Sequence, residues 1–180
     1  MEINTILDPI DLGAMALPEF QRGYVWNRNQ VRELMRSLYL RHPVGGLLVW
    51  VTKTEHADAR GNQDLAAGNV RLILDGQQRV TSLYGIVRGE PPAFFQGNPK
   101  AFTDLYFNMA EESFEFYGPV KMRDNPYWIS VTRLMRKGLS PFISEINQDP
   151  EMAANMGTLV ERLTRLIERC QAQLQQVFEP

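Results

Sequence analysis

Apolar residues recur with a helical period in several stretches of the chain, and each stretch predicts an amphipathic helix. The first covers residues 4–15, and the second follows Asn27, a good N-cap residue, and should end near His42. A third runs from Gln77 to Val87 and is stopped by the glycine and prolines that follow it. Residues 151–178 predict the longest helix, with one apolar stripe along its length. That stripe either packs on the domain's own core or begins a further helical region.

Short continuous apolar runs predict strands. Residues 44–51 are apolar apart from two glycines, which is typical of a strand buried on both faces. Residues 53–69 are polar and predict a surface connection. Residues 70–74 predict a second buried strand, which leads directly into Asp75 and Gly76 at the start of the third helix.

The second half of the chain carries further signals. Residues 104–109 and 113–117 predict a pair of strands around a turn. Trp128 and Ile129 are expected to anchor another short helix.

The loop at residues 16–26 has an unusual composition. It is punctuated by Pro and Gly, yet it holds Phe20, Tyr24, Trp26 and Arg22. Loops of compact domains lie on the surface, so this crowding indicates either a buried brace or a binding face.

Composition places the chain among ordinary globular domains. It has 180 residues, of which 44% are hydrophobic and 22% charged. The single cysteine, Cys170, cannot form an internal disulfide, and no Cys/His cluster has the spacing of a zinc site. The N-terminus lacks a basic and apolar export signal, and no apolar run is long enough to span a bilayer. These features predict a soluble cytoplasmic protein with no membrane contact.

The charge balance limits any contact with nucleic acid to a local one. The formal net charge is -2, and affinity for DNA without regard to sequence comes from many Lys and Arg contacts to phosphate. Arginines are nevertheless concentrated between residues 22 and 41, which allows a local positive patch. The alternative is that these arginines are solvated residues on a helix face.

The turn Asp75-Gly76-Gln77-Gln78-Arg79 is the strongest candidate for chemistry. A glycine between a strand and a helix lets the backbone approach an anion, and the free N–H groups of the first helical turn attract phosphate. Arg79 could add a charge-assisted pair, and Asp75 could hold Mg²⁺, orient a water or bind a ribose hydroxyl. The amides of Gln77 and Gln78 could position a water or read a base edge.

The same pentapeptide also has an ordinary interpretation, because Asp-Gly is common in turns without any ligand. Its position between a strand and a helix favours the phosphate hypothesis. The chain has no Gly-X-X-X-X-Gly-Lys-Ser/Thr element, which leaves this turn as the one credible phosphate cradle in the sequence.

Two separate motifs together resemble a known family. They are Leu17–Trp26, followed by Leu34 and Ser37-Leu38, and then Asp75–Leu83. In order and spacing they resemble the N-terminal domain of GmrSD-type modification-dependent restriction proteins. More distantly they are similar to the ParB/sulfiredoxin superfold, in which a Gly-X-X-Arg turn binds nucleotide phosphates. The resemblance covers residues 15–90 well and residues 100–180 loosely.

The resemblance implies an α+β fold, with a ParB/sulfiredoxin-like small mixed sheet, flanking helices and a long C-terminal helix. Residues 1–120 would form the nucleotide-binding domain. Residues 121–180 would form a helical extension of a chain truncated from a longer protein. Whether the chain forms a homodimer stays open.

In function, the resemblance implies binding and hydrolysis of a nucleoside triphosphate with Mg²⁺, coupled to recognition of modified phage DNA. DNA cleavage would belong to a C-terminal or separate His-Asn-His nuclease domain. The two histidines, His42 and His56, have no matching set of metal ligands, so this chain is not expected to cut DNA through such a site.

The family's roles transfer to particular residues of this sequence. The catalytic residues would be Asp75, Gln78 and Arg79, with Asp75 also the metal ligand. The nucleotide-binding residues would be Gln21, Arg22, Gly76, Gln77, Thr81 and Ser82. Tyr24 and Trp26 would stack a nucleobase or contact DNA, or else brace the core.

Three functions remain open from the sequence. The first is a nucleotide-dependent enzyme, and the second is a module that binds nucleotide or modified DNA without turnover. In the third the turn is purely structural, and the long helix is a surface for a dimer or another partner.

Overall fold

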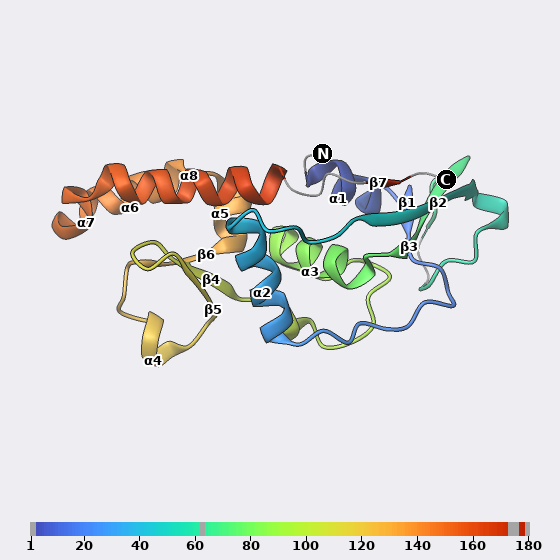
Figure 1. Cartoon of the computed structure of the whole chain (residues 1–180), viewed down its shortest axis with the longest axis horizontal. Helices are drawn as coiled ribbons and strands as arrows, with labels where there is room; N and C mark the ends of the chain where they lie inside the picture. Colours follow the sequence, from blue (N-terminus) through green and yellow to red (C-terminus); the bar gives the residue numbers. More distant parts are fainter. Residues whose placement is uncertain (1–2, 62–63, 173–176, 179–180) are drawn as a thin grey trace.

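A computed structural model describes residues 3–61, 64–172 and 177–178, and these form a mixed α+β fold (Figure 1). The helices are α1 Asn4–Asp11, α2 Arg28–Tyr39, α3 Gln77–Arg88, α4 Pro119–Met122, α5 Val131–Lys137, α6 Ser140–Gln148, α7 Pro150–Ala154 and α8 Met156–Ala172. The strands are β1 Met15–Ala16, β2 Leu47–Lys53, β3 Asn69–Asp75, β4 Leu105–Asn108, β5 Ser113–Phe116, β6 Trp128–Ser130 and β7 Val177–Phe178. The predicted α+β class is confirmed, while the likeness to the ParB/sulfiredoxin superfold stays a prediction.

The strands form two small sheets on either side of α3. One sheet has the order β1-β3-β2-β7, and the other has the order β5-β4-β6. The central pair of the first sheet, β2 and β3, is antiparallel, whereas β1 runs parallel to β3. In Figure 1 α3 crosses the middle of the molecule between the two sheets, and α8 runs along one side. The start of α3 therefore lies where the first sheet ends.

Local sequence signals account for α2. The Asn27 side chain accepts hydrogen bonds from the backbone N–H groups of Asn29 and Gln30, and Gln30 Oε1 accepts from the Asn27 N–H at 3.0 Å. This reciprocal pair satisfies N–H groups that a helix leaves without partners at its start. The predicted N-cap is confirmed, and the apolar stripe of α2 is buried against the core.

Strand β2 differs from the prediction of a strand buried on both faces. Leu47 and Val49 are buried, whereas Leu48 and Trp50 are 41% and 45% exposed. The main core covers one face of the sheet, and in the described residues the other face carries a small buried cluster of Ala16, Val70 and Leu72, with Ala57, Ala59 and Leu65 packed against it. An antiparallel pair with one covered face alternates in burial, which a run of apolar residues conceals.

The short helix expected at Trp128 and Ile129 is present as α5, but both residues lie just before it, in strand β6. Ile129 pairs with Phe107 and Trp128 with Asn108 of β4. The helix begins only at Val131, after the Ser130 hydroxyl accepts a hydrogen bond from the Arg133 N–H.

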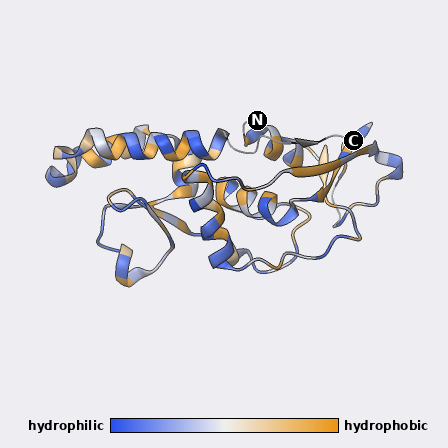
Figure 2. Cartoon of the chain, viewed as in Figure 1, coloured by the Kyte–Doolittle hydropathy of each residue, from blue (hydrophilic) through white to orange (hydrophobic). Residues whose placement is uncertain are grey.

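The long C-terminal helix is also interrupted. Asp149 caps α7, which ends at Asn155 in a non-helical conformation before α8 begins. Residues 173–176 of the predicted helix lie outside the described part, and residues 177–178 pair with β2 as strand β7 instead of continuing the helix. Figure 2 shows hydrophobic and hydrophilic bands along α8. Its apolar side is buried in the domain's own core through Leu159, Leu163, Leu166 and Cys170.

Buried side chains from both sides of residue 120 join one core cluster, which includes Leu105, Phe107, Phe142 and Leu163. The predicted boundary between domains at residue 120 stays a prediction. None of the helices in the described residues is long and apolar enough to cross a membrane.

Candidate functional site

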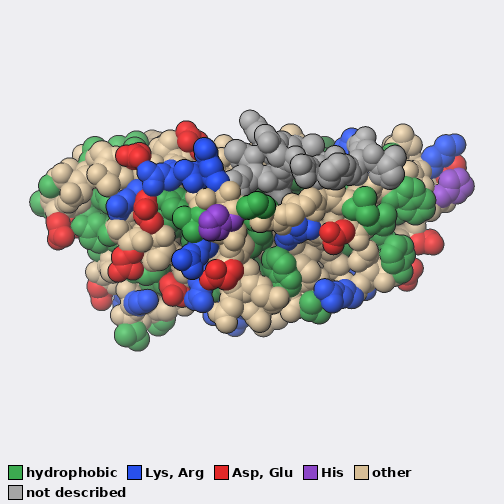
Figure 3. Space-filling model, viewed as in Figure 1, with side chains coloured by type: hydrophobic (Ala, Val, Ile, Leu, Met, Phe, Trp, Pro, Cys, Tyr) green, Lys and Arg blue, Asp and Glu red, His purple; other side chains and the backbone are tan. Residues whose placement is uncertain are grey.

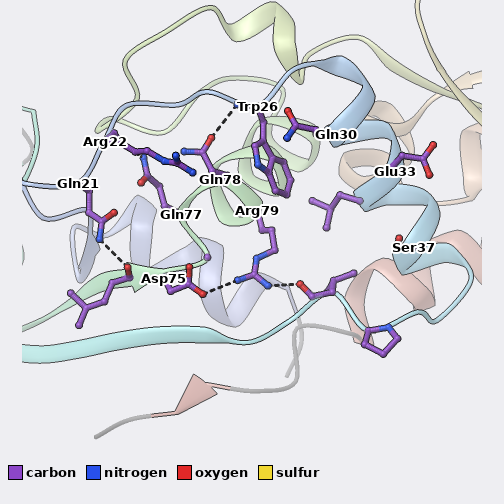
Figure 4. A pocket seen from close by; sticks show the side chains of 15 residues that line it. Gln21, Arg22, Trp26, Gln30, Glu33, Ser37, Asp75, Gln77, Gln78 and Arg79 are labelled. Atoms are coloured by element: carbon purple, nitrogen blue, oxygen red, sulfur yellow. Dashed lines mark hydrogen bonds and ion pairs between the residues drawn. The ribbon is translucent and has the colours of Figure 1, made fainter.

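The junction of β3 and α3 lines a cavity of about 510 Å³. The opposite walls come from the loop at residues 17–26 and from α2 (Figure 4). Eight of the predicted site residues line it, namely Gln21, Arg22, Trp26, Asp75, Gly76, Gln77, Gln78 and Arg79. The volume is within the range of small-molecule sites, roughly 300–1,000 Å³. Two motifs that are far apart in sequence therefore meet at one cavity.

Gly76 gives the junction its backbone shape. It is the N-cap of α3 with φ 91° and ψ 4°, in the left-handed region. A Cβ at this position would collide with the Leu47 side chain and crowd Arg79 Nη2 at 3.1 Å. The glycine is therefore required by packing on the sheet side. Among the described residues, no capping side chain bonds to the first N–H groups of α3.

Arg79 lies in the cavity wall and is held by backbone carbonyls. Its side chain is only 15% exposed. It donates to the carbonyl of Val44, to that of Gly46 at 2.7 Å and to Asp75 Oδ2 at 3.3 Å. The Nε–H and one Nη1–H of the guanidinium have no partner among the described residues. Arg79 thus holds the segment before β2, and two of its N–H groups have no acceptor among the described residues.

The glutamine amides hold the aromatic loop, a role that sequence reasoning missed. Gln78 Oε1 accepts from the N–H groups of Val25 at 2.9 Å and Trp26 at 3.2 Å, and its Nε2 donates to the Gly23 carbonyl. Gln77 Nε2 donates to the Arg22 carbonyl at 2.7 Å.

From the loop side, Gln21 Nε2 donates to the Leu74 carbonyl at 2.9 Å. A loop that lies against a helix start needs partners for its backbone groups, and adjacent amide side chains are suited to supply them. The adjacent amides of Gln77 and Gln78, next to a loop whose backbone needs partners, were the feature of the sequence that could have predicted this role.

Three predicted site residues do not reach the cavity. The Ser82 hydroxyl bonds to the Gln78 carbonyl and to the Tyr24 hydroxyl, both at 2.7 Å, and Thr81 is buried inside α3. The Tyr24 ring packs against Phe95 and Phe102, with centroids 5.6 and 5.3 Å away.

Burial raises the pKa of the Tyr24 hydroxyl to about 12. Tyr24 therefore packs in the core, whereas Trp26 lines the cavity, so the two aromatic residues have different roles.

The charged residues that line the cavity are Arg22, Glu33, Asp75 and Arg79. Arg22 is exposed, and its side chain has no hydrogen-bond or ion-pair partner in the part of the chain that is described. The Asp75 side chain is 74% exposed, and its ion pair is with Arg79. Figure 4 shows Arg22, Gln77, Asp75 and Arg79 around one space.

The donor set is too small for a metal site built from protein alone. Within residues 3–61, 64–172 and 177–178, no group of three His, Cys, Asp or Glu side chains could hold a metal ion. A magnesium ion that keeps waters and shares phosphate oxygens needs only one or two carboxylates. Asp75 can supply one.

Comparison with known proteins links the chain to a restriction system. The sequence profile of the GmrSD restriction endonuclease, N-terminal domain, matches residues 3–175. The chain is also similar to an uncharacterized protein of Methanocaldococcus jannaschii, with 37% identity over 83 residues, which is 40% of this chain and 14% of that protein. The matched part is thus a small share of that relative's length.

Proposed function

The chain belongs to the family of the GmrSD restriction endonuclease N-terminal domain, and from this premise we propose that it binds and hydrolyses a nucleoside triphosphate at the β3–α3 junction. The observation that carries the proposal is that, among the described residues, no side chain caps the start of α3 and none pairs with the exposed Arg22 at the same cavity. Free N–H groups at a helix start and a guanidinium both favour a bound phosphate. The Trp26 ring in the same wall offers a face for the nucleobase.

In the hydrolytic reaction, a water oxygen forms a bond to the terminal phosphorus. The bond from that phosphorus to the bridging oxygen breaks, and nucleoside diphosphate leaves together with inorganic phosphate. Asp75 would orient the water or accept its proton, since its carboxylate is accessible at the cavity. Arg22 and the remaining donors of Arg79 would balance the negative charge of the phosphates.

A magnesium ion fits this site as a companion of the nucleotide. Asp75 would hold it together with phosphate oxygens, because the described residues offer no complete set of protein ligands. The ion would supply charge neutralisation on the phosphates.

A second candidate is a module that binds nucleotide without turnover. It is favoured by Gln78, whose amide bonds to the backbone of Gly23, Val25 and Trp26. An amide committed to these bonds cannot position a water unless the loop moves. Both candidates share the phosphate site and differ in whether phosphate is released.

The bonds between the loop and the junction offer a route for coupling to DNA. A ligand at the start of α3 would change the positions of the Gln77 and Gln78 side chains. These side chains hold the backbone of residues 22–26 through hydrogen bonds. Recognition of modified DNA through that loop would then depend on the nucleotide. We assign cleavage to a His-Asn-His nuclease domain, C-terminal or separate.

Phosphate release by the purified chain tests the enzymatic proposal. With Mg²⁺ and each common nucleoside triphosphate in turn, we expect inorganic phosphate from at least one, and we expect Asp75→Asn to abolish it. Glu90→Gln is a matched control, because Glu90 is an exposed carboxylate outside the cavity. Calorimetric binding with no phosphate release would favour the binding module. The absence of both would refute the phosphate site.

A further inference from the structure

One wall of the cavity at the β3–α3 junction is a face of α2. Gln30, Glu33, Leu34 and Ser37 line it. These residues are three or four positions apart, so their side chains project from the same side of the helix. Leu34 is buried, and the other three side chains are polar. This wall therefore offers hydrogen-bonding groups that the phosphate site at the start of α3 does not use.

Trp26 lies between the start of α3 and this wall. Its backbone N–H donates to Gln78 Oε1 at 3.2 Å, and it directly precedes Asn27, the N-cap of α2. The side chain is partly buried against the main core and also lines the cavity. In Figure 4 the Trp26 ring is drawn between Arg22 and Glu33. A base stacked on this ring would direct its phosphates toward α3 and its polar edge toward α2.

Charge gives the bound nucleotide the same direction. Figure 3 shows acidic and basic side chains next to one another over α2, so no extended field of one sign acts there. Individual residues then set the sign of the charge within the cavity. The Arg22 guanidinium attracts the phosphates, whereas the Glu33 carboxylate repels them. Glu33 therefore faces the uncharged end of the nucleotide, which is the base.

The Glu33 carboxylate is available to accept hydrogen bonds. Arg36 Nη1 lies 3.8 Å from Glu33 Oε2, and both side chains are more than half exposed, at 65% and 58%. An exposed ion pair of this length contributes little, so it does not hold the carboxylate away from a ligand. Glu33 also borders a neighbouring groove, which contains Arg32 and Arg36.

Gln30 supplies a donor one turn earlier. Its Oε1 accepts from the Asn27 N–H at 3.0 Å, whereas its Nε2 has no acceptor within the described part of the chain. The α2 wall thus combines a charged acceptor with an amide donor.

We propose that Glu33 and Gln30 make this site selective for guanine, so that the nucleotide is guanosine triphosphate. The proposal rests on the function proposed above and adds the identity of the base. Guanine carries two adjacent donors, N1–H and the N2 amino group, which match the two oxygens of one carboxylate. Its O6 lies next to them and accepts from the Gln30 amide.

The other bases do not match a carboxylate in this way. Adenine and cytosine place a ring nitrogen acceptor beside their amino group, and uracil places its N3–H between two carbonyl oxygens. Each would set a lone pair against the Glu33 carboxylate, which disfavours its binding.

The test titrates the full chain with the β,γ-imido triphosphates of guanosine, adenosine, cytidine and uridine, which resist hydrolysis. Calorimetry in the presence of Mg²⁺ gives the dissociation constant of each for wild type, Glu33→Gln and Glu168→Gln. Glu168 is the matched control, because it is an exposed carboxylate on the helix α8 and does not line the cavity. Thermal melting of all three proteins checks the fold.

We expect wild type to bind the guanosine analogue at least about tenfold more tightly than the other three, because hydrogen bonds to an ionised group are worth more than a factor of ten. Glu33→Gln should remove this preference by weakening guanosine binding at least about tenfold, while the other analogues change by less than about threefold. Glu168→Gln should behave as wild type.

Equal affinity of the wild-type chain for the four analogues, or preference for another base, would overturn the proposal. An undiminished guanine preference in Glu33→Gln would overturn the role of Glu33. These outcomes leave the phosphate site intact, because all four analogues share the triphosphate. Binding of none of them would refute the phosphate site and the guanine proposal together.

Discussion

Gln78 either holds the backbone of the loop at residues 22–26 or contacts the bound nucleotide, and replacing it distinguishes these two roles. Its amide makes three hydrogen bonds to loop backbone, to the N–H groups of Val25 and Trp26 and to the Gly23 carbonyl. A typical hydrogen bond contributes about 0.5–1.5 kcal/mol to stability, and groups left unpaired in a partly buried site add to the loss. Water can replace some of these partners, so we expect Gln78→Ala to lower the free energy of unfolding by about 1.5–3 kcal/mol.

Urea unfolding followed by tryptophan fluorescence measures this change, since Trp26 is attached to the same loop. Gln96→Ala is the matched control, because its side chain makes no hydrogen bond in the described part of the chain and does not line the cavity. At about 2–4 °C per kcal/mol, the melting temperature should fall by roughly 3–12 °C. A loss below about 0.5 kcal/mol, together with lost nucleotide affinity, would refute the brace and make Gln78 a ligand contact.

Three further predictions address the site and its surroundings. Arg22→Gln should weaken nucleotide binding by about 1.5–3 kcal/mol in calorimetry with no change in melting temperature, because its guanidinium has no partner in the described structure; an unchanged dissociation constant would remove Arg22 from the site. Gly76→Ala should destabilise the fold by at least about 1 kcal/mol in urea unfolding, owing to its left-handed φ of 91° and the contact with Leu47; a neutral variant would show that the junction relaxes. Burial raises the pKa of Tyr24 to about 12 from 10.0, so the protonated hydroxyl stabilises the folded state below pH 10 and this stability is lost as pH rises toward 12; Tyr24→Phe should reduce that loss, and an identical pH profile would contradict the assignment.

Features governed by nearby residues were predictable from the sequence. The start of α2 follows from Asn27 and Gln30, whose side chains satisfy each other's backbone groups within four residues. The β3–α3 junction follows from an apolar run that meets Asp75-Gly76 and a helical pattern. Both signals are local, so no knowledge of the tertiary packing was needed.

Features that depend on distant packing were not predictable. Whether Leu48 and Trp50 are buried depends on what covers the outer face of the sheet, and their hydrophobicity alone does not reveal it. The break at Asn155, which has a non-helical backbone between α7 and α8, has no strong signal in the nearby sequence.

The same limit applies to the candidate site. The sequence predicted that the two motifs face one pocket, and most of the predicted residues do line one cavity, while their roles stay predictions. It could not distinguish Gln78, whose amide bonds to loop backbone, from Arg22, whose side chain has no partner among the described residues. That distinction depends on atoms separated by more than fifty residues along the chain.

The most direct test of the central claim is the backbone amide NMR spectrum of the chain during titration with a nucleoside triphosphate and Mg²⁺. We predict saturable shifts of the Gln77, Gln78 and Arg79 amides at the start of α3, with smaller changes in the loop that these residues hold. If other amide signals shift saturably while the Gln77, Gln78 and Arg79 signals stay unchanged at saturating nucleotide, the result would contradict a phosphate site at this junction.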